Sequence, residues 1–262
     1  MCVPKFWVEE WLMSTTPVIA PEAPQAPGPI NHLGRIIGAF FSPKATFEDI
    51  VHRPSWIIPV ALMTVLGIVV AFVMNRKVDW RDVASKRIEE SPRAANLSAE
   101  QKEQQIAMSA KFSPGAAYAF GALGPILAVV VVAAVMLLAY NVIGGANANF
   151  SVAMGIVSHA FVVTILCTLF FILILYLKPP GTIDLENPVA TNLGAFLPDS
   201  TPKVLMPLAK SIDIFSDWVL LLISIGFAAV NPKKLKGKSL SIAISVWAIY
   251  VACKMGIAWI FS

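Results

Sequence analysis

The feature that most restricts the fold of this chain is an uncharged stretch from Phe112 to Leu177. These 66 residues contain no Asp, Glu, Lys or Arg. A short segment of small and polar residues, 144–149 (GGANAN), divides the stretch into two apolar runs. One helical crossing of a bilayer needs about 20 apolar residues, so the stretch has room for two crossings. It predicts a membrane-spanning helical hairpin.

The composition agrees with a membrane protein and argues against several other classes. Hydrophobic residues make up 57% of the 262-residue chain and charged residues only 14%, whereas soluble proteins have about 25% charged residues. The basic residues are spread over several loops, so the net charge of +4 does not indicate nucleic-acid binding. The three cysteines show neither a disulfide framework nor metal-ligand spacing, and no metal site or cofactor is predicted.

The hydrophobic pattern along the chain predicts an all-α membrane protein, a five-transmembrane-helix bundle. The expected spans are 56–74, 116–143, 150–177, 212–230 and 240–261. The second is longer than a crossing requires, so it is tilted, kinked at Pro125 or protrudes. In the polar segment before it, Ser98 and Gln101 form a capping-box pattern, which predicts a separate helix from there towards Lys111. One membrane domain, residues 30–262, therefore comes after the N-terminal region.

The N-terminal region predicts a disordered Pro-rich tail over residues 1–29. Residues 14–29 hold five prolines among small and polar residues, a composition that cannot bury enough apolar surface to order itself. The first dozen residues differ in character from the Pro-rich residues after them. We therefore hypothesise that Met13 is the true initiator.

An amphipathic helix is expected directly after this tail. Its apolar residues fall at helical spacing on one face, and Ser42-Pro43 then ends the helix and begins a second short one. The residues expected at the membrane interface are Ile36, Ile37, Phe40 and Phe41. A helix lying in the interface is the functional interpretation. A helix packed under the bundle is the alternative, and the two are compatible.

The orientation is predicted from the loops. Five spans place the termini on opposite sides of the membrane, and the raw count of Lys and Arg does not separate the two sides. The short connector 231–238 (NPKKLKGK), however, holds four lysines and no acid. Because positive charge near span ends stays in the cytoplasm, we expect the connector and the N-terminus to be cytoplasmic.

Charged residues inside the expected spans are candidates for a functional role, because burying a charge in the bilayer is costly. Asp213 and Asp217 are four residues apart and share a helix face, and Lys254 falls at a similar depth in the last span. We therefore expect an intramembrane Asp217–Lys254 pair, assisted by Asp213. In the alternative, Lys254 extends to the membrane surface and Asp213 caps its helix.

His159 is the only His of the uncharged stretch and lies within the third expected span. A polar side chain at this depth usually forms a hydrogen bond within the bundle. The candidate partners are Ser158, Thr164, Asn141 and Tyr140. Metal or haem ligation is the weaker interpretation, because no second His lies at ligand spacing in the spans.

Three segments carry a resemblance to a known family. They are 40–47 (FFSPKATF), 143–161 (IGGANANFSVAMGIVSHAF) and 211–230 (SIDIFSDWVLLLISIGFAAV). Their order and spacing resemble the bacterial branch of the Yip (Ypt-interacting protein) domain family, over residues 30–262. The family-like turn includes Gly144, Gly145 and Phe150. The resemblance implies a five-pass, multi-pass protein of a bacterial inner (plasma) membrane with a cytosolic N-terminus.

The function implied by the resemblance is limited. Eukaryotic members of the family are similar to Rab-binding and membrane-trafficking factors, but their Asp-Leu-Tyr-Gly-Pro signature is absent here, so binding of small GTPases is not expected. The sequence contains no Gly-rich phosphate loop and no GxSxG, HExxH or CxxC motif, which predicts a protein that is not an enzyme.

We therefore expect an integral membrane scaffold or adaptor. Its partners would be the lipid bilayer and membrane proteins, or further copies of itself. A small transporter or ion-conducting subunit that uses Asp213, Asp217, Lys254 and His159 is one alternative. An accessory subunit of a larger membrane complex, with the loop 75–113 as its docking surface, is another.

Overall fold

The computed structural model describes residues 28–261 except 90, 92, 93, 95, 180, 181, 184, 186, 199 and 203. The predicted Pro-rich tail and Met13 lie outside these residues, apart from 28 and 29. Over the described ranges the regular elements are helices, and the one β-type pairing among them is an isolated bridge between Asn192 and Asp213. The all-helical prediction is confirmed.

Four helical segments are long and apolar enough to cross a membrane. They are α3 (Ile57–Lys77), α5 (Ala99–Val142), the consecutive helices within Phe150–Leu177, and α11 (Ser239–Phe261). The segment Phe150–Leu177 comprises α6 (Phe150–Ala160), the 3₁₀ turn η2 (Phe161–Val163) and α7 (Thr164–Leu177). The remaining predicted span corresponds to α9 (Ile214–Val230), whose 17 residues lie at the short end of what a crossing needs.

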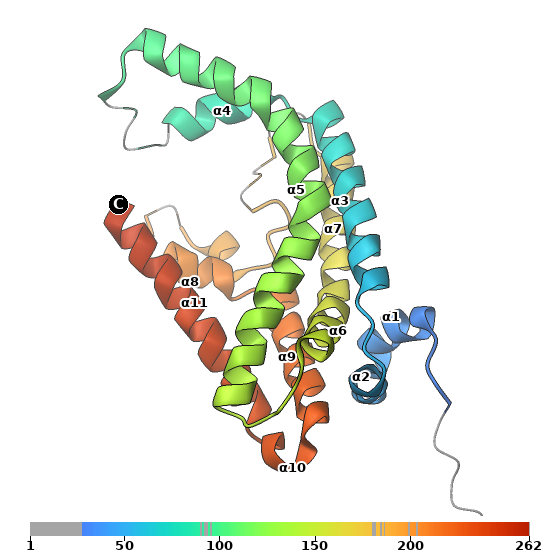
Figure 1. The fold of residues 1–262 in the computed structure, drawn as a ribbon. Helices are drawn as coiled ribbons and strands as arrows, with labels where there is room; N and C mark the ends of the chain where they lie inside the picture. Colours follow the sequence, from blue (N-terminus) through green and yellow to red (C-terminus); the bar gives the residue numbers. More distant parts are fainter. Residues whose placement is uncertain are drawn as a thin grey trace, which may run out of the picture.

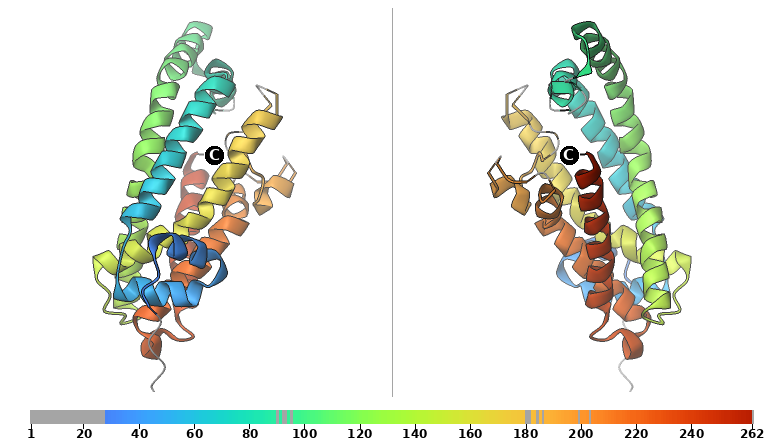
Figure 2. Two further views of the ribbon diagram at one scale, coloured as in Figure 1. Left: turned by 90° about the vertical axis from the view of Figure 1, so that its right-hand side faces the viewer. Right: turned by 90° about the vertical axis from the view of Figure 1, so that its left-hand side faces the viewer.

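Short helices connect and flank these segments. At the N-terminal side are α1 (His32–Phe41) and α2 (Pro43–His52), and α4 (Trp80–Glu89) comes after α3. The connection to α9 contains η3 (Leu193–Phe196) and α8 (Met206–Ser211), and α10 (Pro232–Leu235) precedes α11. Figure 2 shows α1 and α2 at the end of the bundle where α10 and the turn between α5 and α6 also lie. This end is called the lower end below, as in Figure 1.

Helix α5 differs from its prediction. A separate helix ending near Lys111 was expected, but one helix of 44 residues, about 66 Å long, runs from Ala99 to Val142. The capping box is confirmed, because the Gln101 amide donates to Ser98 Oγ at 3.2 Å and the Ser98 amide donates to Gln101 Oε1 at 2.9 Å. The surplus length protrudes beyond the other helices at the upper end, beside α4 (Figure 1).

The contact between α3 and α5 depends on two glycines. A Cβ added at Gly67 would lie 2.5 Å from the carbonyl oxygen of Gly121, and a Cβ added at Gly121 would lie 2.5 Å from that of Gly67. The two backbones therefore touch, as small residues allow between membrane helices. By contrast, a Cβ at Gly124, three residues further along α5, would meet nothing within 4 Å.

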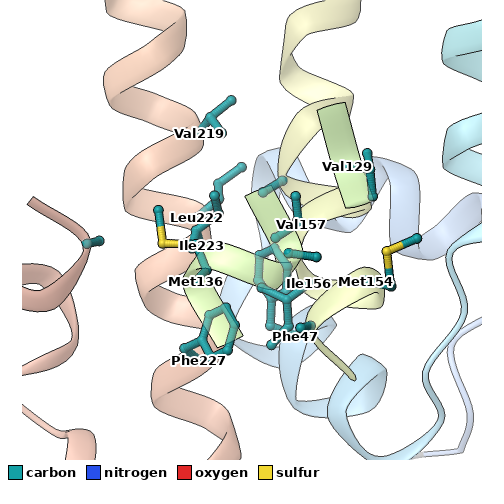
Figure 3. Packing of buried hydrophobic residues seen from close by; sticks show 14 of the residues in the cluster. Phe47, Val129, Met136, Met154, Ile156, Val157, Val219, Leu222, Ile223 and Phe227 are labelled. Carbon is teal, nitrogen blue, oxygen red and sulfur yellow. The ribbon is translucent and has the colours of Figure 1, made fainter. Parts of the chain in front are cut away.

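The core lies where α2, α5, α6 and α9 meet. Phe47 of α2, Ile156 of α6 and Phe227 of α9 are fully buried and lie near one another (Figure 3). A Cβ added at Gly226 would fall 2.4 Å from Ile156 Cγ2 and 3.0 Å from Phe47 Cδ1, so α9 packs tightly against both helices. The N-terminal helix α2 thus belongs to the core of the membrane domain.

The contact between Gly67 and Gly121 can be tested by comparing two matched substitutions in α5. Substituting Gly121→Ala should separate α3 from α5 and lower the stability by about 1–3 kcal/mol, the usual cost of overpacking. Gly124→Ala makes the same chemical change in open space and should leave the stability unchanged or slightly higher. Thermal unfolding in mild detergent measures both variants. Equal unfolding temperatures for the two would contradict the close approach.

Candidate functional site

Lys254 and Asp217 do not form the expected pair. Among the described residues, no ion pair within 4.0 Å joins them; Lys254 Nζ instead donates to Ser211 Oγ at 3.0 Å. The sequence-based estimate compared only the depths of the two residues and did not include the direction in which each side chain points. In the structure α8 ends at Ser211, which faces Lys254, whereas Asp217 lies one turn inside α9 with its side chain exposed.

Asp213 caps helix α9, which was the alternative interpretation of this residue. Its Oδ1 accepts hydrogen bonds from the amides of Phe215 at 3.1 Å and Ser216 at 3.0 Å. Its Oδ2 accepts a hydrogen bond from the Thr191 hydroxyl. A carboxylate at a helix N-terminus is also favoured by the helix dipole. Asp213 therefore fixes the start of α9 and joins it to the preceding connection.

His159 is fully buried in α6, and its hydrogen bond stays within its own helix. Nδ1 lies 2.8 Å from the carbonyl oxygen of Gly155. Since a carbonyl oxygen only accepts, Nδ1 carries the proton. Nε2 has no hydrogen-bond partner among the described residues. Among the described residues, no side-chain hydrogen bond or ion pair joins any two of the four polar residues 159, 213, 217 and 254. Over the same residues, no group of three or more His, Cys, Asp or Glu side chains is arranged to hold a metal ion.

The family-like turn between α5 and α6 is built for close packing. Gly145 has a left-handed φ of 61°, and its amide donates to the Asn141 carbonyl at 3.2 Å, as in the αL type of helix end. A Cβ at Gly144 would lie 2.6 Å from Leu235 of α10. Phe150 lies just beyond the turn at the start of α6 and is half-exposed. The turn therefore brings the lower ends of α5, α6 and α10 together.

A polar contact at the same end was missed by sequence reasoning. The Tyr140 hydroxyl donates to the carbonyl oxygen of Ser239 at 2.7 Å, and Ser239 Oγ donates to the carbonyl oxygen of Ser224. The Tyr140 ring stacks on Phe227 with 4.1 Å between centroids. These contacts join α5, α9 and α11. Only a Tyr in an apolar run, which needs a partner for its hydroxyl, could have suggested them.

The expected interfacial residues are divided between two environments. Ile37 and Phe41 are exposed, with Leu33 one turn earlier on the same side of α1. Ile36 and Phe40 are partly buried, and the Phe40 ring packs on the bundle in a T-shaped contact with Trp218, with 5.7 Å between centroids. Helix α1 therefore packs on the bundle with one apolar side and leaves another uncovered at the lower end.

A buried ion pair holds α1 and α2 in this position, and sequence reasoning also missed it. Arg35 Nε donates to Asp49 Oδ2 at 2.7 Å, and Arg35 Nη1 donates to the Arg53 carbonyl at 2.9 Å and to Ser55 Oγ at 2.6 Å. The Arg35 side chain is only 5% exposed. A basic residue within an otherwise apolar helix is the signal that could have indicated the contact.

The fold and these contacts define a multi-pass α-helical membrane protein whose N-terminal helices are part of the bundle. The model of the Yip1 domain matches residues 37–257, most of the chain. The protein therefore belongs to the Yip1 domain family. No curated protein and no solved structure matches it.

The role of the buried Arg35 side chain in holding α1 and α2 can be tested by a conservative substitution. Arg35→Lys keeps the charge but cannot hold Asp49, Arg53 and Ser55 together, because an ammonium lacks the planar fork of the guanidinium. We expect local opening of α1 and α2 to become easier by about 1–3 kcal/mol. Hydrogen exchange of the α1 amides measures it. Arg53→Lys, whose own side chain is exposed, is the control and should exchange like the wild type.

The tyrosine contact gives a further prediction. Tyr140→Phe keeps the stack on Phe227 but removes the hydroxyl, and should destabilise the protein by about 1–2 kcal/mol. Tyr118→Phe, in the same helix but partly exposed, should have little effect. Thermal unfolding of the two variants provides the comparison, and an unaltered Tyr140→Phe would show that the hydroxyl bond contributes nothing.

Proposed function

We propose that the protein is a non-catalytic scaffold or adaptor of the bacterial inner membrane that acts through protein partners. The observation that carries this proposal is a helical projection at the upper end, formed by α4 and residues 99–115 of α5 and called the upper arm here (Figure 1). A crossing needs about 20 residues, so the 44-residue α5 has surplus length for a projection outside the bilayer.

The upper arm is held in a fixed direction by polar contacts. The Asn75 side chain at the end of α3 donates to the Pro114 carbonyl of α5 at 3.3 Å and accepts from Trp80 Nε1 at 2.8 Å. Arg81 of α4 forms an ion pair with Glu103 of α5. A projection fixed in this way needs less ordering when it binds, which favours association.

The arm also presents an apolar surface. Met108 and Phe112, one helical turn apart on α5, are 58% and 64% exposed. Exposed Met and aromatic side chains are enriched at protein interfaces. The same feature supports the narrower alternative, an accessory subunit of a larger membrane complex that docks through this loop.

The arrangement of polar residues favours an adaptor over a transporter. A conduction path would bring Asp213, Asp217 and Lys254 together along a hydrated route. Asp213 caps α9, Lys254 contacts Ser211, and Asp217 faces outward from the described helices. At the lower end, α1, α2 and the lysine connector lie together, which supports a cytoplasmic N-terminus.

The adaptor role predicts a specific loss of association. The tagged protein, purified from its native membrane in gentle detergent, should carry a partner in a defined ratio. Met108→Glu with Phe112→Glu should reduce that partner by about tenfold, because two carboxylates would be buried in the contact. Met108→Leu with Phe112→Leu keeps the surface apolar and should retain it. Quantitative mass spectrometry measures the ratio.

Two results would count against this proposal. One is a full complement of partner on the Glu variant. The other is a wild-type protein that purifies alone and carries an ion flux in proteoliposomes, which would favour the transporter alternative.

A further inference from the structure

A cavity of about 650 Å³ lies above the contact between Tyr140 and Ser239, between α5, α7, α9 and α11. Its walls include Val135 and Met136 of α5, Thr168 of α7, Ile223 of α9, and Trp247 and Tyr250 of α11. The volume falls within the range of about 300–1,000 Å³ that is usual for small-molecule sites. Neither the Yip1 family match nor the proposed adaptor role assigns anything to it.

The cavity results from how two helices are arranged. At the lower end α5 and α11 are joined through Tyr140 and Ser239. Above this contact they diverge (Figure 1). Val131 and Val135, which line the cavity on α5, are 59% and 47% exposed, so the cavity is reached from the side of the bundle that faces the bilayer.

The walls are apolar and do not require water. Most lining residues are aliphatic or aromatic. The two threonine hydroxyls on the wall are bonded to nearby backbone, since Thr164 donates to the Phe161 carbonyl at 2.7 Å and Thr168 donates to the Thr164 carbonyl at 2.9 Å. An apolar cavity open to the bilayer is favourable for a hydrocarbon chain and unfavourable for water.

One end of the cavity carries both signs of charge. The Asp213 carboxylate is part of the lining. Lys254 lies beside the lining residue Tyr250, with Nζ 5.3 Å from the ring centroid, and donates to Ser211, two residues before Asp213. No ion pair within 4.0 Å joins Lys254 to Asp213 among the described residues, so at this end the ammonium is available to the phosphate of a headgroup and the carboxylate to its ammonium.

We infer that this cavity binds a membrane phospholipid, with one acyl chain between α5, α9 and α11 and the headgroup at the Asp213–Lys254 end. Three features favour such a molecule: the apolar walls, the exposure of Val131 and Val135 on the bilayer side, and the two opposite charges at one end. The site is independent of the upper arm, so it stands whether or not a protein docks there.

The first experiment fills the cavity. Val135→Phe places a ring in it, whereas Val142→Phe makes the same change on the same helix at a position that is 74% exposed and outside the lining. Native mass spectrometry of the detergent-purified chains, titrated with phosphatidylethanolamine, measures bound lipid. We expect one lipid per wild-type or Val142→Phe chain, and affinity about tenfold lower for Val135→Phe.

The headgroup is tested with Lys254→Met, which removes the ammonium at the rim. Phosphatidylethanolamine and phosphatidylglycerol should both bind more weakly to this variant, because both carry a phosphate. Wild-type protein should prefer phosphatidylethanolamine, whose ammonium is complementary to Asp213. A wild-type preference for phosphatidylglycerol, or unaltered binding to Lys254→Met, would overturn the assignment of the headgroup end.

A second measurement needs no substitution and remains decisive if Val135→Phe does not fold. Wild-type protein in bilayers is irradiated with phosphatidylethanolamine that carries a diazirine on its acyl chain. Labels should appear on Met136 and Ile223, which line the cavity and are 5% and 2% exposed, in addition to outward-facing residues such as Leu138 at 66%.

Three outcomes would overturn the lipid site. They are labels confined to outward-facing residues, undiminished lipid binding by a folded Val135→Phe, and a wild-type chain that binds no lipid but pairs with a second copy through α5 and α11. The last result would identify the face as an interface between copies of the chain. None of these results depends on whether a partner co-purifies through the upper arm.

Discussion

The architecture depends on the hydrogen bond that the buried hydroxyl of Tyr140 forms. A Tyr in an apolar helix brings a donor into a region without water, so its hydroxyl must bond within the protein. Tyr140 bonds to the Ser239 carbonyl and stacks on Phe227, which fixes α5, α9 and α11 against one another at the lower end. The adjacent Gly144 lets α10 approach this point. A single packed junction of α5, α9 and α11 thus forms at one end of the domain.

The two ends of the molecule differ because of this junction. At the lower end, α2 enters the core, and the Arg35–Asp49 pair holds α1 against it. Above the junction α5 and α11 diverge and leave a cavity, and α5 continues into the upper arm. The packed end holds the helices in place, whereas the open end offers surfaces to lipids and proteins. This difference between the two ends is the structural basis of the proposed adaptor role.

The sequence predicted the class of fold because the thickness of the bilayer sets the apolar length that each crossing helix needs, whatever the other helices do. The apolar runs predicted the four long spans. Local residues predicted the capping box at Ser98 and the short helix after Ser42, because both features depend only on neighbouring positions in the sequence. The family resemblance was also carried by local segments and is confirmed by the match over residues 37–257. The prediction for α5 was wrong because polar residues lower hydropathy without ending a helix, so the boundary near Lys111 marks only a change of environment.

The sequence identified the polar residues of the candidate site but not the groups that each of them contacts. The sequence located Asp213, Asp217, Lys254 and His159, yet depth counted along the chain could not show that α8 stops at Ser211 and presents a serine to Lys254. The sequence by itself determined that the chain is a helical membrane protein, since hydropathy and local capping suffice for that. Only the tertiary structure decided which groups meet: Arg35 with Asp49, Tyr140 with Ser239, and four helices around one cavity. The physical reason is that these contacts join residues 14 to about 100 positions apart, and their geometry depends on how the helices cross.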